Sequence, residues 1–314
     1  MLTYEQVKTK PEVLCAMTSL YAPEFEKLAT VFGQMWEQYR EAHPTTAQPR
    51  QRQRGGGRKA TLATPEDKLL FILFYLKTYP LQEVFAFLFG MAQSTACTWL
   101  HELSAVLQLT LAELEQIPQR LPPPPSAAAE PPPSKVVALA SNTPQELALD
   151  GTERRRQRPK DSNKQTEYYS GKKHAHTVKN NVLAGVTDKH IYYLSETYVG
   201  KTQDKRICDE EPLQYAPNTI LYQDKGFQGH APAAVIVQQP QKKPRGCALP
   251  AEEQIRNALI SRIRIVIENI IASIKRCRIV KDVFRNTKAG FDDLVMELAC
   301  GLHNFRTAER ARTT

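Results

Sequence analysis

Two clusters of proline divide this chain of 314 residues. Pro122–Pro125 and Pro131–Pro133 enclose an alanine-rich run within residues 119–144. Because proline lacks a backbone N–H and fixes its own backbone angle, such a stretch cannot lie inside a helix or a sheet. We expect a stiff, polyproline-like linker over 119–144; the alternative is a ligand for an aromatic groove of a partner. The chain is therefore expected to fold as separate parts on either side.

Residues 1–60 are expected to form a helical segment followed by a basic arm. Apolar residues recur every three or four positions between Leu20 and Trp36, which is the period of a helix. The stretch Arg50–Lys59 is basic, rich in glycine and free of apolar residues. It is either a solvated linker or an arm that follows DNA phosphates or enters a minor groove, and the two interpretations are compatible.

Residues 61–118 carry a pattern of consecutive helices. The first begins at Thr64, a good N-cap, with Pro65 behind it. The second ends at Gly90, and the third is expected to use Ser94 as its cap. A glycine at such a turn is typical of a helix-turn-helix DNA-binding unit, although a plain three-helix bundle fits the pattern as well. In the DNA-binding interpretation the third helix presents polar residues to the groove, namely Gln93, Ser94, Thr95, Thr98 and His101.

Beyond the linker, strand and helix patterns alternate from 145 to 306, and a tail follows at 307–314. Strands are expected at 147–150, 173–187, 190–197, 219–224 and 234–238. Helices are expected at 204–213, 252–276 and 291–306. Three strands that open a sheet, followed by a helix, two more strands and a helix, describe an α/β domain with a mixed sheet.

One glutamate stands between two cations in the expected helix 252–276. Arg264, Glu268 and Lys275 fall within a stripe about 40° wide at about 100° per residue. The surrounding isoleucines predict that this helix is buried, where unused charges are costly. Upstream, Asp150 and Asp224 each end an apolar run that reads as a strand. Carboxylates from two strand ends and a helix would form an oxygen-ligand site for Mg²⁺ or Mn²⁺.

The overall charge narrows the class of partner. A formal charge of +9 and a pI near 9.2 favour a polyanion. A membrane partner is not expected, because no stretch approaches the roughly 18 apolar residues of a spanning helix. The N-terminus lacks a secretory signal, so a cytoplasmic protein is expected. The six cysteines lie far apart without a C-x-x-C pair, which predicts reduced packing residues.

Four local motifs follow one another in a characteristic order. They are Asp150-Gly-Thr-Glu, Tyr169-Ser-Gly-Lys-Lys, Asp224-Lys-Gly-Phe-Gln-Gly and Asn257-x-x-x-Ser261-Arg-Ile-Arg-Ile-Val-Ile-Glu268. Over residues 62–306 the chain resembles the DDE transposases of bacterial insertion sequences, in particular the IS-five, Harbinger-like branch. The resemblance implies an RNase H-like catalytic domain with a mixed α/β sheet at 145–306, preceded by an all-α helix-turn-helix domain at 61–118.

The resemblance also implies roles for particular residues. Asp150, Asp224 and Glu268 match the catalytic, metal-binding triad, which would hold two Mg²⁺ or Mn²⁺ ions. Arg264 and Lys275 match the cations of the family signature. Two positions depart from the pattern: Ser261 stands where relatives have tyrosine, and Asp204 lacks the histidine that often precedes it in relatives, so we expect Asp204 to be structural. Further candidates for binding DNA phosphate, from basic runs near the acids, are Arg155, Arg158, Lys172, Lys173 and Lys243.

The function implied is that of a transposase. It would be a metal-dependent endonuclease and strand transferase that cuts double-stranded DNA at the terminal inverted repeats of its element and joins the ends to target DNA, acting as a homodimer and without an organic cofactor. Two alternatives stay open. One is an element-derived protein that binds DNA without catalysis, and the other is a stand-alone RNase H-like nuclease.

Overall fold

The structure is a computed structural model that describes residues 1–43, 60–121, 136–243, 246 and 248–312. The predicted basic arm at 50–59 and both proline clusters lie outside these residues. The chain divides into two compact units. One comprises Met1–Ile117, Arg276–Ile279 and Glu309–Thr314, and the other comprises Pro118–Lys275 and Val280–Ala308.

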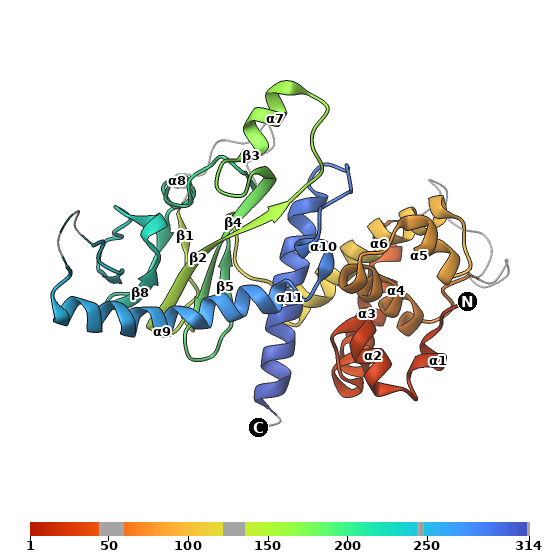
Figure 1. Ribbon diagram of the computed structural model, residues 1–314. Coiled ribbons are helices and arrows are strands. Elements are labelled where there is room, and N and C mark those ends of the chain that lie inside the picture. Colours follow the sequence, from red (N-terminus) through yellow and green to blue (C-terminus); the bar gives the residue numbers. More distant parts are fainter. Residues whose placement is uncertain (44–59, 122–135, 244–245, 247, 313–314) are drawn as a thin grey trace. The chain divides into compact units, whose positions relative to one another are not determined.

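The first unit is helical (Figure 1). In chain order its helices are α1 (Tyr4–Val7), α2 (Pro11–Thr18), α3 (Ala22–Ala42), α4 (Pro65–Thr78), α5 (Gln82–Leu88) and α6 (Gln93–Glu113). Helix α4 begins as predicted, because the Asp67 N–H donates to Thr64 Oγ1 over 3.1 Å. Ser94, by contrast, is not a cap. Helix α6 begins at Gln93 with Ala92 as its N-cap, since the chain re-enters a helix directly after the preceding turn.

The turn between α5 and α6 depends on Gly90. Its φ of 65° lies in the left-handed region, which glycine adopts without steric cost. The Met91 N–H donates to the Ala86 carbonyl over 3.0 Å and closes the turn. Phenylalanine rings pack beneath it, with Phe71 and Phe85 centroids 4.3 Å apart. The small Ala86, the Gly90 turn and the core of phenylalanine rings give α5 and α6 the geometry of a helix-turn-helix pair.

The second unit is built on a mixed sheet. Its strands are β1 (Val137–Ala138), β2 (Glu146–Arg155), β3 (Tyr169–Ser170), β4 (Ala175–Gly185), β5 (Ile191–Leu194), β6 (Tyr198–Val199), β7 (Leu213–Gln214), β8 (Thr219–Gln223) and β9 (Val235–Gln238). The main order is β3-β4-β2-β8-β9, and β5 and β6 also pair with β4. Strand β2 runs antiparallel to β4 and parallel to β8, as β8 does to β9. Strands β1 and β7 form a separate parallel pair.

Helices and a short turn of 3₁₀ helix complete this unit. They are α7 (Ser162–Tyr168), α8 (Asp204–Glu210), η1 (Lys225–Phe227), α9 (Ala251–Ile274) and most of α11 (Phe291–Ala311), while α10 (Arg278–Lys281) is divided between the two units. Helix α9 packs against β2 and β8 (Figure 1). Helix α11 secures β5, because the Asn304 side chain accepts the Ile191 N–H over 2.8 Å and donates to the Ile191 carbonyl over 3.0 Å.

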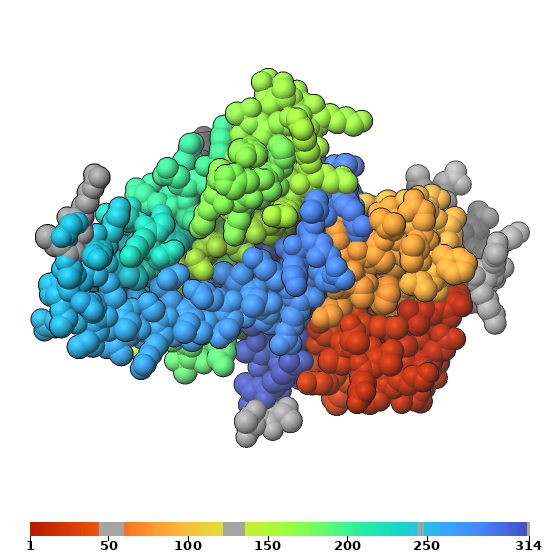
Figure 2. All heavy atoms as spheres, viewed as in Figure 1, coloured from red at the N-terminus to blue at the C-terminus, as the bar shows by residue number. Residues whose placement is uncertain are grey.

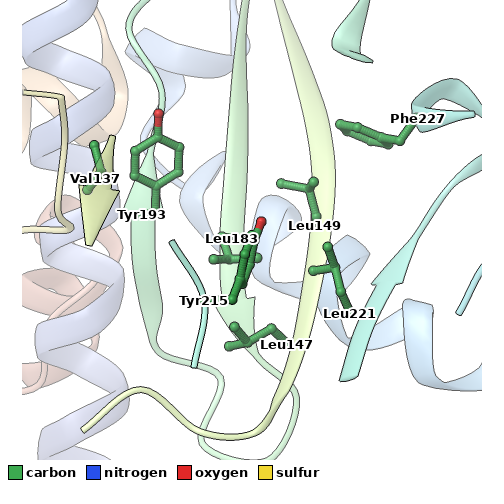
Figure 3. Close-up of a cluster of buried hydrophobic side chains, with 8 residues drawn as sticks. All are labelled: Val137, Leu147, Leu149, Leu183, Tyr193, Tyr215, Leu221 and Phe227. Atoms are coloured by element: carbon green, nitrogen blue, oxygen red, sulfur yellow. The ribbon is translucent and has the colours of Figure 1, made fainter. Parts of the chain in front are cut away.

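An apolar cluster fills one face of the sheet. Figure 3 shows its members, which come from strands β1, β2, β4, β5 and β8, from η1 and from the residue after β7: Val137, Leu147, Leu149, Leu183, Tyr193, Tyr215, Leu221 and Phe227. Since successive side chains of a strand point to opposite faces, this cluster decides which residues of β2 face the other way.

Several boundaries differ from the sequence prediction. The expected linker is folded into the second unit at both ends, because Gln119 pairs with β5 and Val137 is buried against the sheet. The expected tail at 307–314 is mostly the end of α11. Strand β2 continues beyond Asp150, where pairing with β4 carries it to Arg155. Polar residues do not end a strand whose backbone is still paired.

Helix α9 is less buried than its isoleucines predict. Ile255 is 64% exposed, Leu259 is 54% exposed and Ile265 is 50% exposed. Only the side that faces the sheet is covered, chiefly in the C-terminal half of the helix around Ile267 and Ile274. Figure 2 shows the surface of α9, in light blue, open along its length.

Candidate active site

Asp150 lies in the middle of β2, on the face opposite the apolar cluster. Its neighbour Leu149 belongs to that cluster, so alternation turns the Asp150 carboxylate towards α9. The Gly151 N–H donates to Asp150 Oδ1 over 2.9 Å, which fixes the carboxylate beside the strand. The side chain is only partly exposed.

Asp224 and Glu268 reach the same face from other elements. Asp224 follows β8, the parallel neighbour of β2, and is the N-cap of η1; its Oδ1 accepts the Lys225 N–H over 2.6 Å. Glu268 lies on α9, which packs against both strands. The side chain of Asp224 is 45% exposed and that of Glu268 is 59% exposed. Three acids far apart in the chain thus meet on one side of the sheet.

Arg264 lies between the two more exposed acids. Its guanidinium is 3.6 Å from Asp224 Oδ1 and 3.9 Å from Glu268 Oε1, while only 12% of its side chain is exposed. Its Nε is buried and has no hydrogen-bond partner among the described residues. Arg264 is therefore part of a three-residue arrangement that includes both Glu268 and Asp224.

The electrostatics of Asp150 reflect this gathering of charge. Burial raises the pKa of Asp150 from 3.8 to about 6, although the Arg264 cation and the Gly151 N–H lower it. The negative charges of Asp224 and Glu268 also contribute to this raised pKa. Loss of solvent therefore affects mainly the carboxylate of Asp150. The sequence suggested instead that Glu268 would be the buried acid.

The acids are not drawn together into a cation cage. Among the residues that the structure describes, no three His, Cys, Asp or Glu side chains are close enough to hold a metal ion. The Arg264 guanidinium balances two of the carboxylates instead. The donor set is made of carboxylate oxygens, which is the chemistry that Mg²⁺ and Mn²⁺ prefer.

One of the expected phosphate-binding lysines, Lys275, lies near Asp150, and another, Lys173, lies near Lys275. Lys275 is the C-cap of α9, and burial lowers the pKa of its ammonium. The positive charge of Lys173 lowers this pKa further, while the negative charge of Asp150 raises it. Lys173 and Lys275 are therefore close enough to act on each other's charge, and Lys275 is also close to Asp150.

The other four candidates for binding DNA phosphate do not contact the acids in the described part of the chain. Arg155, Lys172 and Lys243 are exposed, and Arg158 donates to Gln165 Oε1 over 2.7 Å. No contact joins these four to the acids among the described residues. Arg154, which belongs to the same basic run as Arg155 and Arg158, is not exposed. It lies on the same face of β2 as Asp150 but is buried there, and it donates to the Asp292 carbonyl and to Asn180 Oδ1.

Asp204 occupies a place that its sequence context did not reveal. A Cβ added to Gly151 would lie 2.9 Å from Asp204 Cγ, and one added to Gly226 would lie 3.3 Å from Asp204 Oδ2. Lys179 Nζ is 3.4 Å from Asp204 Oδ1. Gly151 lies on the face of β2 opposite the side chain of Asp150, so Asp204 packs against that opposite face. In the sequence, the signal for the position of Asp204 was the pair Gly151 and Gly226, which follow Asp150 and Asp224. Each glycine permits the close approach of the Asp204 side chain.

In the helical unit, the expected groove-facing residues lie on the first turns of α6. Gln93, Ser94, Thr95 and Thr98 are all exposed. Gln93 Nε2 donates to Gln82 Oε1 over 2.5 Å and thereby ties α6 to α5. This surface is available to a partner.

Comparison with known proteins matches both units. The family model described as DDE superfamily endonuclease matches residues 149–304, and the model described as helix-turn-helix of DDE superfamily endonuclease matches residues 60–113. The chain belongs to the DDE superfamily endonucleases. It is 24% identical, over 78% of its own length and 82% of the relative's, to a probable transposase for insertion sequence element IS702 from Microchaete diplosiphon. No solved structure matches the chain.

These matches confirm the expected architecture of this DDE-type transposase, an α/β RNase H-like catalytic domain preceded by a helix-turn-helix domain. Within the part of the chain described, no helix is both long and apolar enough to span a membrane.

Proposed function

We propose that this chain is a divalent-metal-dependent transposase that cuts DNA at the terminal inverted repeats of its element and joins the ends to target DNA. The main support is the meeting of Asp150, Asp224 and Glu268, which lie on separate elements of the sheet unit and act on one another's charge. The family supports nuclease chemistry. Three carboxylates that converge around one arginine, with the pKa of one of them raised by burial, are typical of a functional site.

The donor set fits divalent metal ions. Enzymes of the DDE superfamily generally use them, and Asp150, Asp224 and Glu268 would hold two such ions through carboxylate oxygens. The raised pKa of Asp150 is the cost of burying an acid beside two others, and a bound cation would offset it. Bound ions would supply the positive charge that activates an attacking oxygen and neutralises the leaving oxygen of a phosphodiester.

The remaining residues would bind and position DNA. Arg264 lies beside Asp224 and Glu268, and Lys275 lies close to Asp150 with Lys173 near it. These cations would hold the phosphates on either side of the cut. The exposed residues of α6 would read the end sequence in the major groove. A homodimer would hold both element ends together, and the protein would act on chromosomal DNA in the cytoplasm without an organic cofactor.

One assay separates this function from its alternatives. The purified full chain is mixed with DNA that carries the inverted repeats flanking its coding sequence, with Mg²⁺ or Mn²⁺, and cut and joined strands are resolved on a gel. Joining supports a transposase. Specific retention without cutting would mean a DNA-binding protein, and cutting without preference for the ends would mean a stand-alone nuclease.

Variants link the assay to the site. Asp150→Ala and Glu268→Ala should abolish cutting and keep DNA retention. Glu252→Ala, on the exposed first turn of α9, is the matched control and should cut normally. If Asp150→Ala or Glu268→Ala loses retention together with cutting, these acids are structural.

A further inference from the structure

A small cavity lies on the face of the sheet opposite the side chain of Asp150. Its lining includes Leu149, the residue before Asp150, and side chains from β4, β5, α8, the segment after β7 and the loop after η1. The cavity leaves about 10 Å³ for the centre of a water-sized molecule. That space is enough for one water molecule and too small for an organic group.

Three polar atoms of the lining residues have no partner within the described part of the chain. They are Asn181 Oδ1, the Tyr215 hydroxyl and His230 Nε2, and all three are buried. The residue Asn181 is 1% exposed and Tyr215 is 8% exposed. Figure 3 shows the Tyr215 hydroxyl at the end of the ring that lies towards Leu149. Buried polar groups are normally hydrogen-bonded, so three of them at one cavity indicate a shared partner.

The neighbouring polar groups are already engaged. Asn181 Nδ2 donates to the Asp204 carbonyl over 2.9 Å and to Cys208 Sγ over 3.3 Å, which fixes the amide. Glu211, the acid of the lining, accepts the Tyr193 O–H. These contacts leave the partner of the three atoms to come from the cavity itself.

The chemistry of the three atoms selects that partner. Asn181 Oδ1 can only accept a hydrogen bond, whereas the Tyr215 hydroxyl can donate one. Burial lowers the pKa of His230, so its ring is neutral near pH 7 and Nε2 can accept. A water molecule donates two hydrogen bonds and accepts the third. An anion could not donate to Asn181, and an ammonium ion would leave the Tyr215 proton without an acceptor.

We propose that this cavity binds one water molecule, which accepts the Tyr215 O–H and donates to Asn181 Oδ1 and His230 Nε2. The water joins β4, the segment after β7 and the loop after η1, which are remote in the chain. This loop follows Asp224, and Gln223 Nε2 closes it by donating to the His230 carbonyl over 2.9 Å. The water therefore holds the loop after Asp224 against the sheet. The inference goes beyond the proposed function, because it needs neither metal nor DNA.

A crystal structure of the full chain tests the site directly. One electron-density peak should lie at hydrogen-bond distance, about 2.7–3.2 Å, from Asn181 Oδ1, the Tyr215 hydroxyl and His230 Nε2. A cavity without density would overturn the proposal, as would a direct hydrogen bond between the Tyr215 hydroxyl and a protein group.

The variant Tyr215→Phe tests the same site in solution, because it removes one partner of the water and keeps the ring. It should lower the melting temperature of the full chain by about 2–4 °C. Removal of a hydroxyl that lacked any partner would instead leave the melting temperature unchanged or raise it, since the cost of burying that hydroxyl would disappear. Either of these results would overturn the proposal. Tyr169→Phe makes the same change at a residue that is 44% exposed, and it should melt like the wild type.

A double-variant cycle tests whether Tyr215 and His230 share one water. His230→Phe removes the second partner and keeps an aromatic ring. Because both side chains bind the same molecule, the double variant Tyr215→Phe/His230→Phe should lose less than the sum of the two single losses. Additive losses would show that the two side chains act independently, and the shared water would be ruled out.

Discussion

The guanidinium of Arg264 lies 3.6 Å from the Asp224 carboxylate and also faces Glu268 at 3.9 Å. In the structure this cation balances the two acids that we propose as metal ligands. Arg264 and a divalent cation would therefore act on the same oxygens. The protein without metal should be stabilised by Arg264, and the protein with metal should depend on it less.

Removal of Arg264 tests this balance. We expect Arg264→Ala to lower the metal-free stability by about 1 kcal/mol, since its partners are half exposed and solvent screens the pair. The increase in melting temperature on adding Mg²⁺ should become larger than in the wild type. Arg262→Ala, on the exposed side of α9, should change neither quantity. An equal response to Mg²⁺ in both variants would contradict the idea.

The raised pKa of Asp150 predicts a pH dependence of stability without metal. The folded protein holds the Asp150 proton up to about pH 6, whereas the unfolded chain releases it near 3.8. Stability is therefore lost as pH rises through this window. Asp150→Asn should stabilise the protein by about 2–3 kcal/mol above that range and by little below it. Thermal melts in EDTA over a pH series measure this, and a pH-independent difference would rule it out.

Gly151 is expected to tolerate no side chain. In Gly151→Ala the new Cβ would lie 2.9 Å from Asp204 Cγ, so either Asp204 or the strand that carries Asp150 must shift. We expect a loss of about 1–3 kcal/mol of stability and impaired cutting with DNA retention intact. The double variant Gly151→Ala/Asp204→Ala should recover part of both. Gly171→Ala, where a Cβ meets nothing within 4 Å, is the control.

Arg120 should be structural although it falls in the predicted linker. Its guanidinium donates to both oxygens of Asp293, over 2.5 and 2.7 Å. Burial raises the pKa of Asp293, but these bonds outweigh it and the pKa is lowered overall. Arg120→Met should cost about 2–3 kcal/mol in chemical denaturation near neutral pH, and less as pH falls below the usual carboxyl range. Arg312→Met, which breaks an exposed pair, should cost under about 0.5 kcal/mol.

The exposed threonines of α6 should govern recognition of DNA ends. Alanine at Thr95 and Thr98 should weaken binding to the inverted repeats by about tenfold each, and leave binding to unrelated DNA nearly unchanged. Thr30→Ala, on an exposed position of α3, makes the same chemical change away from α6. Electrophoretic shifts at fixed salt concentration measure both. Equal losses on all DNA would mean that these residues contact the backbone only.

Much of the fold was predictable because local rules and tertiary packing agree. The Thr64 cap, the Gly90 turn and the strand before Asp224 all follow from preferences within a few residues. Where backbone pairing continued through polar residues, the sequence pattern failed. Strand β2 extends to Arg155 because β4 pairs with it there, and Gln119 is held by β5.

The sequence by itself determined the family and the order of the two units, and it predicted the three candidate acids, since each has a local motif. Only the tertiary structure decided how the charges are distributed among them. Asp150 is the acid whose pKa is raised by burial, Glu268 is exposed, Arg264 also faces Asp224, and Arg154 is buried. The physical reason is that solvation and pairing depend on which surfaces the folded sheet brings against each side chain, and a linear spacing does not contain that information.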